Sequence, residues 1–468
     1  MSVERASLAG VRATVMGLGL QGGGVETVRY LARAGARVTV TDLRPAQLLG
    51  ESLAAIAGLD VRCVLGEHRR EDFARAELVV ANPAVAPDNE FLRAAREAGV
   101  RVTSEMELFL RACPARVVLI TGTQGKSSTT NATAQLLQAC GVRTHVGGNI
   151  GRALINELDA LAHDDVAVVE ISSYQLEALA SDLGALECVA AVSCVNVLPD
   201  HLERHGSMEA YEACKRRVLD LAGARATVVL PADDPRVGRW RVERGREVRF
   251  SVRPGSEAPL HIADGEFRLG SEVLGKLADS RLAGSFQHAN LLAALGLAHA
   301  LGAQPAQLAS AVAKVRGLEH RLEDLGVRAG RRVWDNGVST TPDSTQAALE
   351  SLGAEVTLLC GGQAKRLELD ALAQCAKRLR TRVVTFGASG EALARGFGAA
   401  GVEAHAAGEL SSAISAAFEL TPRGGQLLFS PACASFDAFR NFRERALAFR
   451  AALPPSDAGA PAFEGTRT

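Results

Sequence analysis

The chain has 468 residues and a net charge of −1, and 47% of its residues are hydrophobic although only 4% are aromatic. This length predicts about three domains with aliphatic cores, and a charge so close to zero argues against a polyanion-binding surface, so we expect no nucleic acid partner. The nine cysteines include no C-x-x-C pair, and no run of about 20 apolar residues occurs, which predicts a cytoplasmic protein with reduced thiols and no membrane association.

Residues 1–104 alternate between predicted strands and helices, which indicates a parallel α/β domain. We expect strands at 11–16, 38–42 and 78–81, and helices from about residue 25 and at 89–98. Residues 17–22 read G-L-G-L-Q-G after the first strand, and Asp42 ends the next one. A glycine turn followed by such an acid binds a nucleotide diphosphate and its ribose. Taken alone, the pattern leaves open NAD, another nucleotide, or a purely structural turn.

A second strand, glycine turn and helix are predicted at residues 117–140. The run through Ile120 is apolar, residues 121–127 read T-G-T-Q-G-K-S, and the segment 127–140 carries good helix formers. The two glycines would let backbone amides converge on a phosphate, while Lys126 adds a positive charge and Ser127 a hydroxyl for Mg²⁺. The spacing departs from the common G-x-x-x-x-G-K-[ST], because the residue five before the second glycine is Ile120. A plain turn with a surface lysine is the alternative.

Two more predicted strands of this central unit, which we place at 105–317, end in polar side chains. The strand at 166–170 ends in Glu170, a carboxylate well placed to hold Mg²⁺ beside a phosphate turn. The strand at 188–196 opens into N-V-L-P-D-H-L-E-R-H. An Asp-His pair directly after a strand indicates a site rather than a surface histidine.

Lysine is scarce, since only six of the 52 Lys and Arg residues are lysines. The two are largely exchangeable on a solvated face, so a retained lysine marks a position that needs a compact or deprotonatable amine. Lys215, on a helix predicted at 208–221, and Lys365, after a glycine turn, are therefore candidates together with Lys126. Further along, the helix predicted at 289–301 follows a segment whose side-chain amides could read a base edge.

A third alternating domain is predicted from residue 318 to 453. We expect its strands near 331–334, 356–360, 383–386 and 426–429. A helix from residue 437 would bury one face made of Phe439, Phe442, Ala446 and Phe449. The tail at 454–468, rich in Pro, Gly and Ala, should be disordered.

These motifs, in this order, resemble the Mur ligase family, and most closely its glutamate-adding members. Counterparts exist there for the glycine loop at 121–127, for E-I-S-S-Y-Q-L-E at 170–177, for the Asp-His motif at 196–205, for V-G-G-N-I-G at 146–151 and for S-P-A-C-A-S-F-D at 430–437. The last motif discriminates best between members. The D-N-P-R of the diaminopimelate-adding relative is absent.

The resemblance implies an α/β protein with the three-domain Mur ligase architecture. An N-terminal Rossmann-like domain would bind a UDP-sugar, a central P-loop ATPase-like domain ATP, and a C-terminal Rossmann-like domain glutamate. The implied activity is ATP-dependent addition of D-glutamate to UDP-N-acetylmuramoyl-L-alanine through an acyl phosphate, in cytoplasmic synthesis of a peptidoglycan precursor. A monomer with two Mg²⁺ ions and a carbamate on Lys215 is expected.

Site residues carry over from the resemblance position by position. The catalytic residues would be Lys126, His201 and Lys215, and the metal ligands Ser127, Glu170, His201 and Lys215. ATP would contact Gly122, Thr123, Gln124, Gly125, Lys126, Ser127, Ser128, Gln287, Asn290, His320 and Arg321. The UDP-substrate would contact Gly19, Leu20, Gln21, Asp42, Arg44, Asn82 and Asn149. Glutamate would contact Thr340, Lys365, Ser435 and Phe442.

The sequence departs from the family at three places. Gln124 and Gln287 replace asparagines, and residues 335–340 read D-N-G-V-S-T where the glutamate-adding enzymes have N-D-S-K-A-T. Asn336 and Val338 therefore change groups that would contact ribose and phosphate. The alternatives are an L-glutamate-adding, other Mur or folyl-polyglutamate-type ligase, an NAD-dependent oxidoreductase, and a non-catalytic sensor of UDP-sugars.

Overall fold

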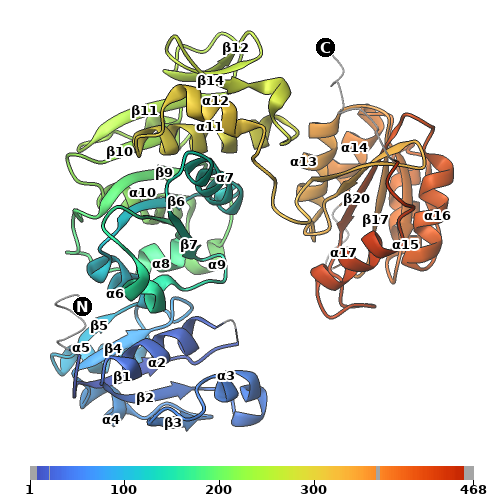
Figure 1. Cartoon of the computed structure of the whole chain (residues 1–468). Coiled ribbons are helices and arrows are strands. Elements are labelled where there is room, and N and C mark those ends of the chain that lie inside the picture. Colours follow the sequence, from blue (N-terminus) through green and yellow to red (C-terminus); the bar gives the residue numbers. More distant parts are fainter. Residues whose placement is uncertain (1–7, 21, 365–368, 458–468) are drawn as a thin grey trace. The chain divides into compact units, whose positions relative to one another are not determined.

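The computed structural model describes residues 8–20, 22–364 and 369–457 and contains three β-sheets (Figure 1). The chain divides into two compact units, of which the first comprises Met1–Leu277 with Ala289–Lys314 and the second Ala278–His288 with Val315–Thr468. The first unit holds two sheets and the second unit holds the third. The domain limits expected after residues 104 and 317 stay a prediction. No helix among the described residues is long and apolar enough to cross a membrane.

The first sheet is parallel, as the alternating sequence predicts, and the structure shows its strand order to be β3-β2-β1-β4-β5. Val15 and Val80 face one side and pack with α2, whereas Met16 and Val79 face the other and pack with α4 and α5. Burial on both faces explains why β4, with the sequence L-V-V-A, is wholly aliphatic. The elements are β1 (Arg12–Met16), α2 (Gly23–Arg33), β2 (Arg37–Asp42), η1 (Ala46–Leu48), α3 (Gly50–Ala55), β3 (Val61–Leu65), α4 (Arg70–Ala74), β4 (Leu78–Ala81), α5 (Glu90–Glu97) and β5 (Arg101–Thr103).

The second sheet has nine strands in the order β14-β13-β12-β11-β10-β9-β6-β8-β7. It is parallel from β7 to β12, and a small antiparallel extension, β12 to β14, continues it. The elements are α6 (Glu105–Ala112), β6 (Arg116–Thr121), α7 (Lys126–Ala139), β7 (Thr144–Gly148), η2 (Leu154–Ala160), β8 (Val166–Glu170), α8 (Ser173–Ala178), β9 (Val189–Cys194), α9 (Leu202–His205), α10 (Met208–Arg216), η3 (Arg217–Leu219), β10 (Thr227–Pro231), η4 (Val237–Arg239), β11 (Arg246–Ser251), β12 (Leu260–Ala263), β13 (Glu266–Leu269), β14 (Glu272–Lys276), η5 (Leu277–Asp279), α11 (Ser285–Ala300) and α12 (Pro305–Val312).

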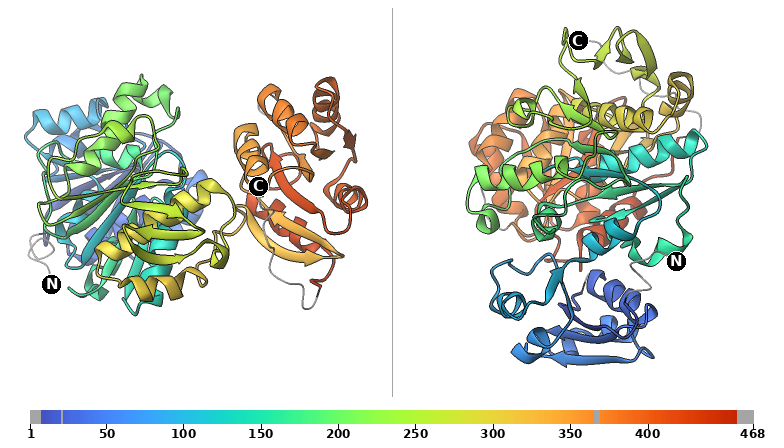
Figure 2. Two further views of the ribbon diagram at one scale, coloured as in Figure 1. Left: turned by 90° about the horizontal axis from the view of Figure 1, so that it is seen from above. Right: turned by 90° about the vertical axis from the view of Figure 1, so that its left-hand side faces the viewer.

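The third sheet has the order β15-β16-β20-β17-β18-β19, in which only the edge strand β15 is antiparallel. Helices lie on both sides of it (Figure 2). Leu358 and Leu428 face the side with α13, α14 and α15, whereas Leu359 and Phe429 face α16 and α17. The elements are β15 (Glu323–Arg328), β16 (Arg331–Asp335), α13 (Pro342–Leu352), β17 (Val356–Gly361), α14 (Asp370–Arg378), β18 (Arg382–Phe386), α15 (Gly390–Ala399), β19 (Ala404–Ala406), α16 (Leu410–Leu420), β20 (Gln426–Ala432) and α17 (Phe442–Ala451).

Two predicted helix starts are wrong. The helix expected from residue 289 begins at Ser285, so the amide of Gln287 lies on α11, as that of Asn290 does, and not in the segment before it. The helix expected from residue 437 begins at Phe442, because the Asn441 side chain accepts a hydrogen bond from the Glu444 N–H and caps it there.

The buried face predicted for that helix is confirmed for Ala446 and Phe449 and wrong for Phe439 and Phe442. Phe439 lies before α17, and Phe442 at its first turn is 37% exposed. The face that packs into the sheet consists of Arg445, Ala446 and Phe449.

The tail expected to be disordered from residue 454 is ordered at its beginning. The Asp457 carboxylate accepts hydrogen bonds from the backbone N–H groups of Ala329 and Gly330, at 3.1 and 2.8 Å. Residues 454–457 therefore lie against the β15–β16 turn. Residues 458–468 of the tail lie outside the described residues.

Arg445 is fully buried at the end of β17 and β20. Its guanidinium donates to the carbonyl oxygens of Gly361, Cys433 and Ala434, at 3.3, 3.0 and 3.0 Å. Burial lowers the pKa of Arg445 to about 10, which still leaves it charged at neutral pH. One cation thus supplies a donor to three carbonyl oxygens, of which that of Ala434 also accepts from the Gln363 N–H, and it holds together the glycine turn after β17 and the loop after β20.

We expect Arg445→Met to lower the free energy of unfolding of the second unit by about 3 kcal/mol. The Gly361 and Cys433 carbonyl oxygens lose the Arg445 donor, at about 1–3 kcal/mol each, whereas Ala434 O keeps the Gln363 N–H, and loss of the buried charge offsets part of the sum. Urea unfolding followed by Trp334 fluorescence in a Trp240→Phe background measures it. Arg443→Met, which removes an exposed arginine paired with Glu319, is the control and should leave the midpoint unchanged. Equal midpoints for the two variants would contradict the structural role of Arg445.

Candidate active site

The glycine loop between β6 and α7 is built as the sequence predicts. Gly122 and Gly125 have φ of 149° and 81°, which favours glycine at both positions. A Cβ at Gly125 would collide with the side-chain oxygen of Asn290, so this glycine also makes room for α11. The helix α7 has no side-chain cap, and its N-terminus faces the loop. The loop can therefore receive an anion at a helix N-terminus.

Asn196, which follows β9, holds this loop in shape. Its Oδ1 accepts from the N–H groups of Thr123 and Gln124 at 3.0 and 2.9 Å, and its Nδ2 donates to Gln124 O at 3.0 Å. The Lys126 ammonium donates to Thr123 O at 2.9 Å. Sequence reasoning noticed the motif that begins at Asn196 but gave that residue no role.

Glu170 lies beside the loop because β8 pairs with β6 in parallel register, Ile120 opposite Glu170. Its Oε1 accepts from Asn149 Nδ2 at 2.8 Å, while its Oε2 is buried without a hydrogen-bond partner. A buried carboxylate oxygen with no donor is costly unless a cation or water reaches it. The side chain of Ser128 is also buried, and its hydroxyl has no partner.

Lys215 on α10 is buried, and its Nζ donates to Gly122 O at 2.7 Å. The ammonium lies 4.7 Å from the centroid of the Tyr211 ring, and the Tyr211 hydroxyl lies 3.1 Å from Thr123 Oγ1. Burial, and then the charge of Lys126, lowers the pKa of Lys215 to about 8. The structure therefore brings both predicted lysines to the same loop.

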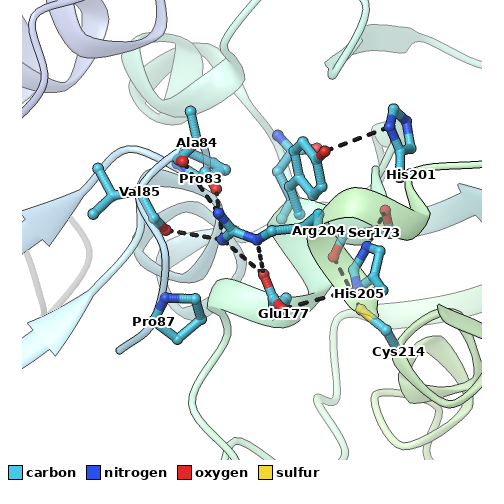
Figure 3. A network of polar contacts seen from close by, with 12 residues as sticks. Pro83, Ala84, Val85, Pro87, Ser173, Glu177, His201, Arg204, His205 and Cys214 are labelled. Carbon is cyan, nitrogen blue, oxygen red and sulfur yellow. Dashed lines mark hydrogen bonds and ion pairs between the residues drawn. The ribbon is translucent and has the colours of Figure 1, made fainter. Parts of the chain in front are cut away.

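His201 has a left-handed backbone, with φ of 52°, and its side chain is 43% exposed. The Tyr174 hydroxyl lies 3.4 Å from His201 Nδ1, and His205 Nε2 lies 3.1 Å from Ser173 Oγ (Figure 3). Arg204, between the two histidines, donates to the Glu177 carboxylate. The motif from residue 196 thus supplies a half-exposed histidine next to an anchored one.

Asp42 is buried at the end of β2, where it organises the first glycine turn. Its Oδ2 accepts from Gly19 N–H at 3.0 Å and its Oδ1 from Arg44 N–H at 2.9 Å. The Asn82 side chain lies against Gly17, on the other side of the turn. Leu20 is 62% exposed and so is available to a ligand, whereas Gln21 lies outside the described residues.

In the structure, the glycines of this turn have other roles than the G-x-G-x-x-G pattern assigns to them. Gly22 has φ of 88° and caps α2, whereas the close helix–strand approach that the third glycine of such a pattern generally permits occurs at Gly24. A Cβ at Gly24 would collide with the carbonyl oxygens of Gly17 and Leu18. The run of three glycines at 22–24 was the available signal, because a fixed G-x-G-x-x-G template tests only its first member.

In the second unit, the two loops expected to hold glutamate lie side by side. Gln363 and Ala434 exchange backbone hydrogen bonds of 2.9 and 3.0 Å, which joins the turn after β17 to the loop that carries Ser435. Ser435 is buried and Thr340 is half-buried. Lys365 lies outside the described residues.

The residues expected to reach ATP from the second unit are mostly buried. Gln287 is 1% exposed and His320 3%, while Arg321 is half-buried. His320 Nδ1 lies 2.7 Å from Asp335 Oδ2, and its Nε2 is buried without a hydrogen-bond partner. The adjacent Asn336 side chain bonds to Leu322 N–H and to the hydroxyls of Ser339 and Ser430.

Family models match two parts of the chain: "Mur ligase middle domain" matches residues 120–298, and "Mur ligase MurD-like, N-terminal domain" matches residues 11–104. The chain is 36% identical over 461 residues to a UDP-N-acetylmuramoylalanine–D-glutamate ligase of Roseiflexus sp., covering 95% of this chain and 98% of that one. The protein of the same name from Geobacter metallireducens is 38% identical over 448 residues, covering 94% and 96%.

Solved structures share the fold at low identity. The ligase MurC of Thermotoga maritima aligns with a TM-score of 0.58 at 17% identity, over 94% of this chain and 98% of that one. MurF of Acinetobacter baumannii aligns with a TM-score of 0.56 at 15% identity, over 95% and 91%. With the full-length identity to the relatives above, these findings show that the chain belongs to the Mur ligase family and, within it, to the MurD-like group.

Proposed function

We propose that this chain is an ATP-dependent ligase that joins D-glutamate to UDP-N-acetylmuramoyl-L-alanine in the synthesis of a peptidoglycan precursor. Full-length identity to ligases of that name supports the substrates. The observation that carries the chemistry is the convergence of Lys126, Glu170 and Lys215 on one glycine loop. A cytoplasmic location and a monomeric state belong to the proposal through the family resemblance.

The donor set suits Mg²⁺. Glu170 Oε2 is a buried carboxylate oxygen without a partner, and carboxylate and hydroxyl oxygens are the ligands that this ion prefers. Ser127, Glu170, His201 and a carbamate on Lys215 would hold two ions. When bound, they would neutralise charge on the transferring phosphoryl group.

The reaction needs an activated carboxylate, because an amide does not form spontaneously from a carboxylate and an amine in water. The alanyl carboxylate attacks the γ-phosphorus of ATP, and the bond from that phosphorus to the β,γ-bridging oxygen breaks. The products of this step are an acyl phosphate and ADP. The N-terminus of α7 and Lys126 stabilise the phosphate charge. The neutral amine of glutamate then attacks the acyl carbon, phosphate departs with the electrons of the C–O bond, and one proton passes to solvent.

The remaining site residues are proposed from the resemblance. Asp42, Arg44 and Asn82 orient the UDP-sugar, and Asn149 adds a contact from the central sheet. Thr340, Lys365, Ser435 and Phe442 hold the two carboxylates of glutamate and leave its amine free.

Phosphate release from ATP should require both UDP-N-acetylmuramoyl-L-alanine and D-glutamate. A coupled phosphate assay with each substrate omitted in turn, repeated with L-glutamate, measures this dependence. Turnover with L-glutamate alone would overturn the stereochemical assignment. Turnover with neither enantiomer would overturn the proposed activity.

We expect Lys215→Arg to reduce kcat by two orders of magnitude or more, on the scale of a lost catalytic group, because a guanidinium keeps the charge but carries no carbamate. Lys276→Arg, at an exposed lysine, is the matched control and should turn over normally. ¹³C NMR with labelled bicarbonate gives an independent measure: the native chain should show a carbamate carbon that Lys215→Arg lacks. Normal turnover by Lys215→Arg would refute the assigned role.

Asp42→Ala should weaken binding of UDP-N-acetylmuramoyl-L-alanine by about 10- to 100-fold, since a lost charged hydrogen bond costs about 1.5–3 kcal/mol and 1.4 kcal/mol is tenfold in affinity. Without the carboxylate, the Gly19 and Arg44 N–H groups lose their acceptor. Isothermal calorimetry measures the change, with the exposed Asp60→Ala as control. Tight NADH binding by the native chain would instead favour an oxidoreductase.

A further inference from the structure

The guanidinium of Arg204 joins two segments that the proposed mechanism treats separately. Arg204 belongs to α9, a four-residue helix that follows His201 and ends with His205. Its Nε and Nη2 donate to Glu177 Oε2 at 2.9 and 2.8 Å. Its Nη1 and Nη2 reach three consecutive carbonyl oxygens of the turn after β4, which lies in the first sheet's domain (Figure 3).

Those carbonyls belong to Pro83, Ala84 and Val85, at 3.5, 3.2 and 2.9 Å from the nitrogens. The turn begins at Asn82, whose Oδ1 accepts from Ala84 N–H and whose side chain lies against Gly17. The turn that the guanidinium contacts therefore lies beside the first glycine turn, where the UDP-sugar is proposed to bind.

On the other side, Arg204 supports the histidine segment. Its guanidinium carbon lies 5.1 Å from the centroid of the Tyr174 ring, and the Tyr174 hydroxyl lies 3.4 Å from His201 Nδ1. Glu177 Oε1 lies 3.8 Å from His205 Nδ1. None of the residues of α9 is buried as a whole. The His205 side chain is nonetheless 2% exposed, and its ring lies 5.2 Å from that of Tyr211. The polar contacts of Arg204 and the ring packing of His205 therefore fix together where α9 lies.

Only arginine can make this set of contacts. The guanidinium presents N–H groups in a planar fork, so it can meet one carboxylate and several carbonyls at once, whereas an ammonium is a point donor. The Arg204 side chain is 15% exposed and that of Glu177 is 25% exposed, which limits screening by solvent.

We propose that Arg204 is a positioning residue that couples occupancy of the UDP-sugar site to the placement of His201. This inference rests on the proposed ligase function. Arg204 itself contacts no substrate in this proposal. The bound UDP-sugar fixes the position of the turn at Asn82, and the hydrogen bonds of the guanidinium to that turn fix the position of α9. Loss of Arg204 then affects both UDP-sugar affinity and turnover at saturation, while ATP affinity stays the same.

The test compares Arg204→Met, Arg204→Lys and Arg33→Met with the native chain. Arg33 is the matched control, because it also joins the domains of these two sheets, through a 3.4 Å hydrogen bond to Asn156, and neither residue belongs to the proposed site. Calorimetry gives affinities for UDP-N-acetylmuramoyl-L-alanine and for a non-hydrolysable ATP analogue, and the phosphate assay gives kcat at saturation.

Both Arg204 variants should bind the UDP-sugar about 10-fold more weakly and lose about 10-fold in kcat, with ATP-analogue affinity within about twofold of native, because each loses the fork. Guanidinium added to Arg204→Ala should partly restore kcat. Asn82→Ala combined with Arg204→Met should be less than additive. Arg33→Met should match the native kinetics even if its melting temperature falls.

The outcomes separate the two proposals. A native chain without ligase turnover overturns the proposed function. A native chain that turns over, with Arg204 variants that differ from it only in melting temperature, overturns the coupling by Arg204. Full additivity between the Asn82 and Arg204 substitutions also overturns it, because the residues would then act independently. If Arg204→Met does not fold, Arg204→Lys decides the same questions.

Discussion

The parallel register of β6 between β8 and β9 is the constraint on which the candidate site depends. Ile120 pairs with Glu170 on one side, and Thr121 pairs with Cys194 on the other. All three strands end at one edge, so the glycine loop, the buried carboxylate and Asn196 meet there. A shift of one residue would reverse the side to which each strand-end side chain points. The aliphatic interiors of these strands fix the register, so packing far from the loop determines its chemistry.

Local patterns predicted the elements that carry the site, and their limits were close. β4 and β8 occupy the residues expected, and α7 begins one residue earlier than expected. The sequence was less informative where a helix start depends on a particular cap or on a tertiary neighbour, as at α11 and α17. The antiparallel strands β12 to β14 were also missed. They are short and partly polar, so they lack the apolar run that marks a buried parallel strand.

Contacts between distant segments could not be predicted from either segment alone. Asn196 closes the glycine loop across more than seventy residues, and Arg204 grips a turn about 120 residues earlier. Arg445 is the clearest case, since a fully buried arginine violates the pattern that places charge outside. In each case the partners are mainly backbone carbonyl or N–H groups, which have no signature in sequence. Their identity follows only from the fold.

The departure at Asn336 has a physical reason in the surrounding charges. Asp335 already places one carboxylate in the buried interior, where Arg450 donates to it at 2.6 Å and His320 lies at 2.7 Å. A second carboxylate at position 336 would repel the first, with little solvent to screen the two charges. Asn336 avoids that repulsion, and its amide bonds to Leu322 N–H and the Ser339 and Ser430 hydroxyls. The Asp-Asn order therefore keeps a single buried carboxylate, that of Asp335, beside Arg450. The family has its acid at position 336, whereas this chain has it at position 335, where it is buried and bonded to Arg450.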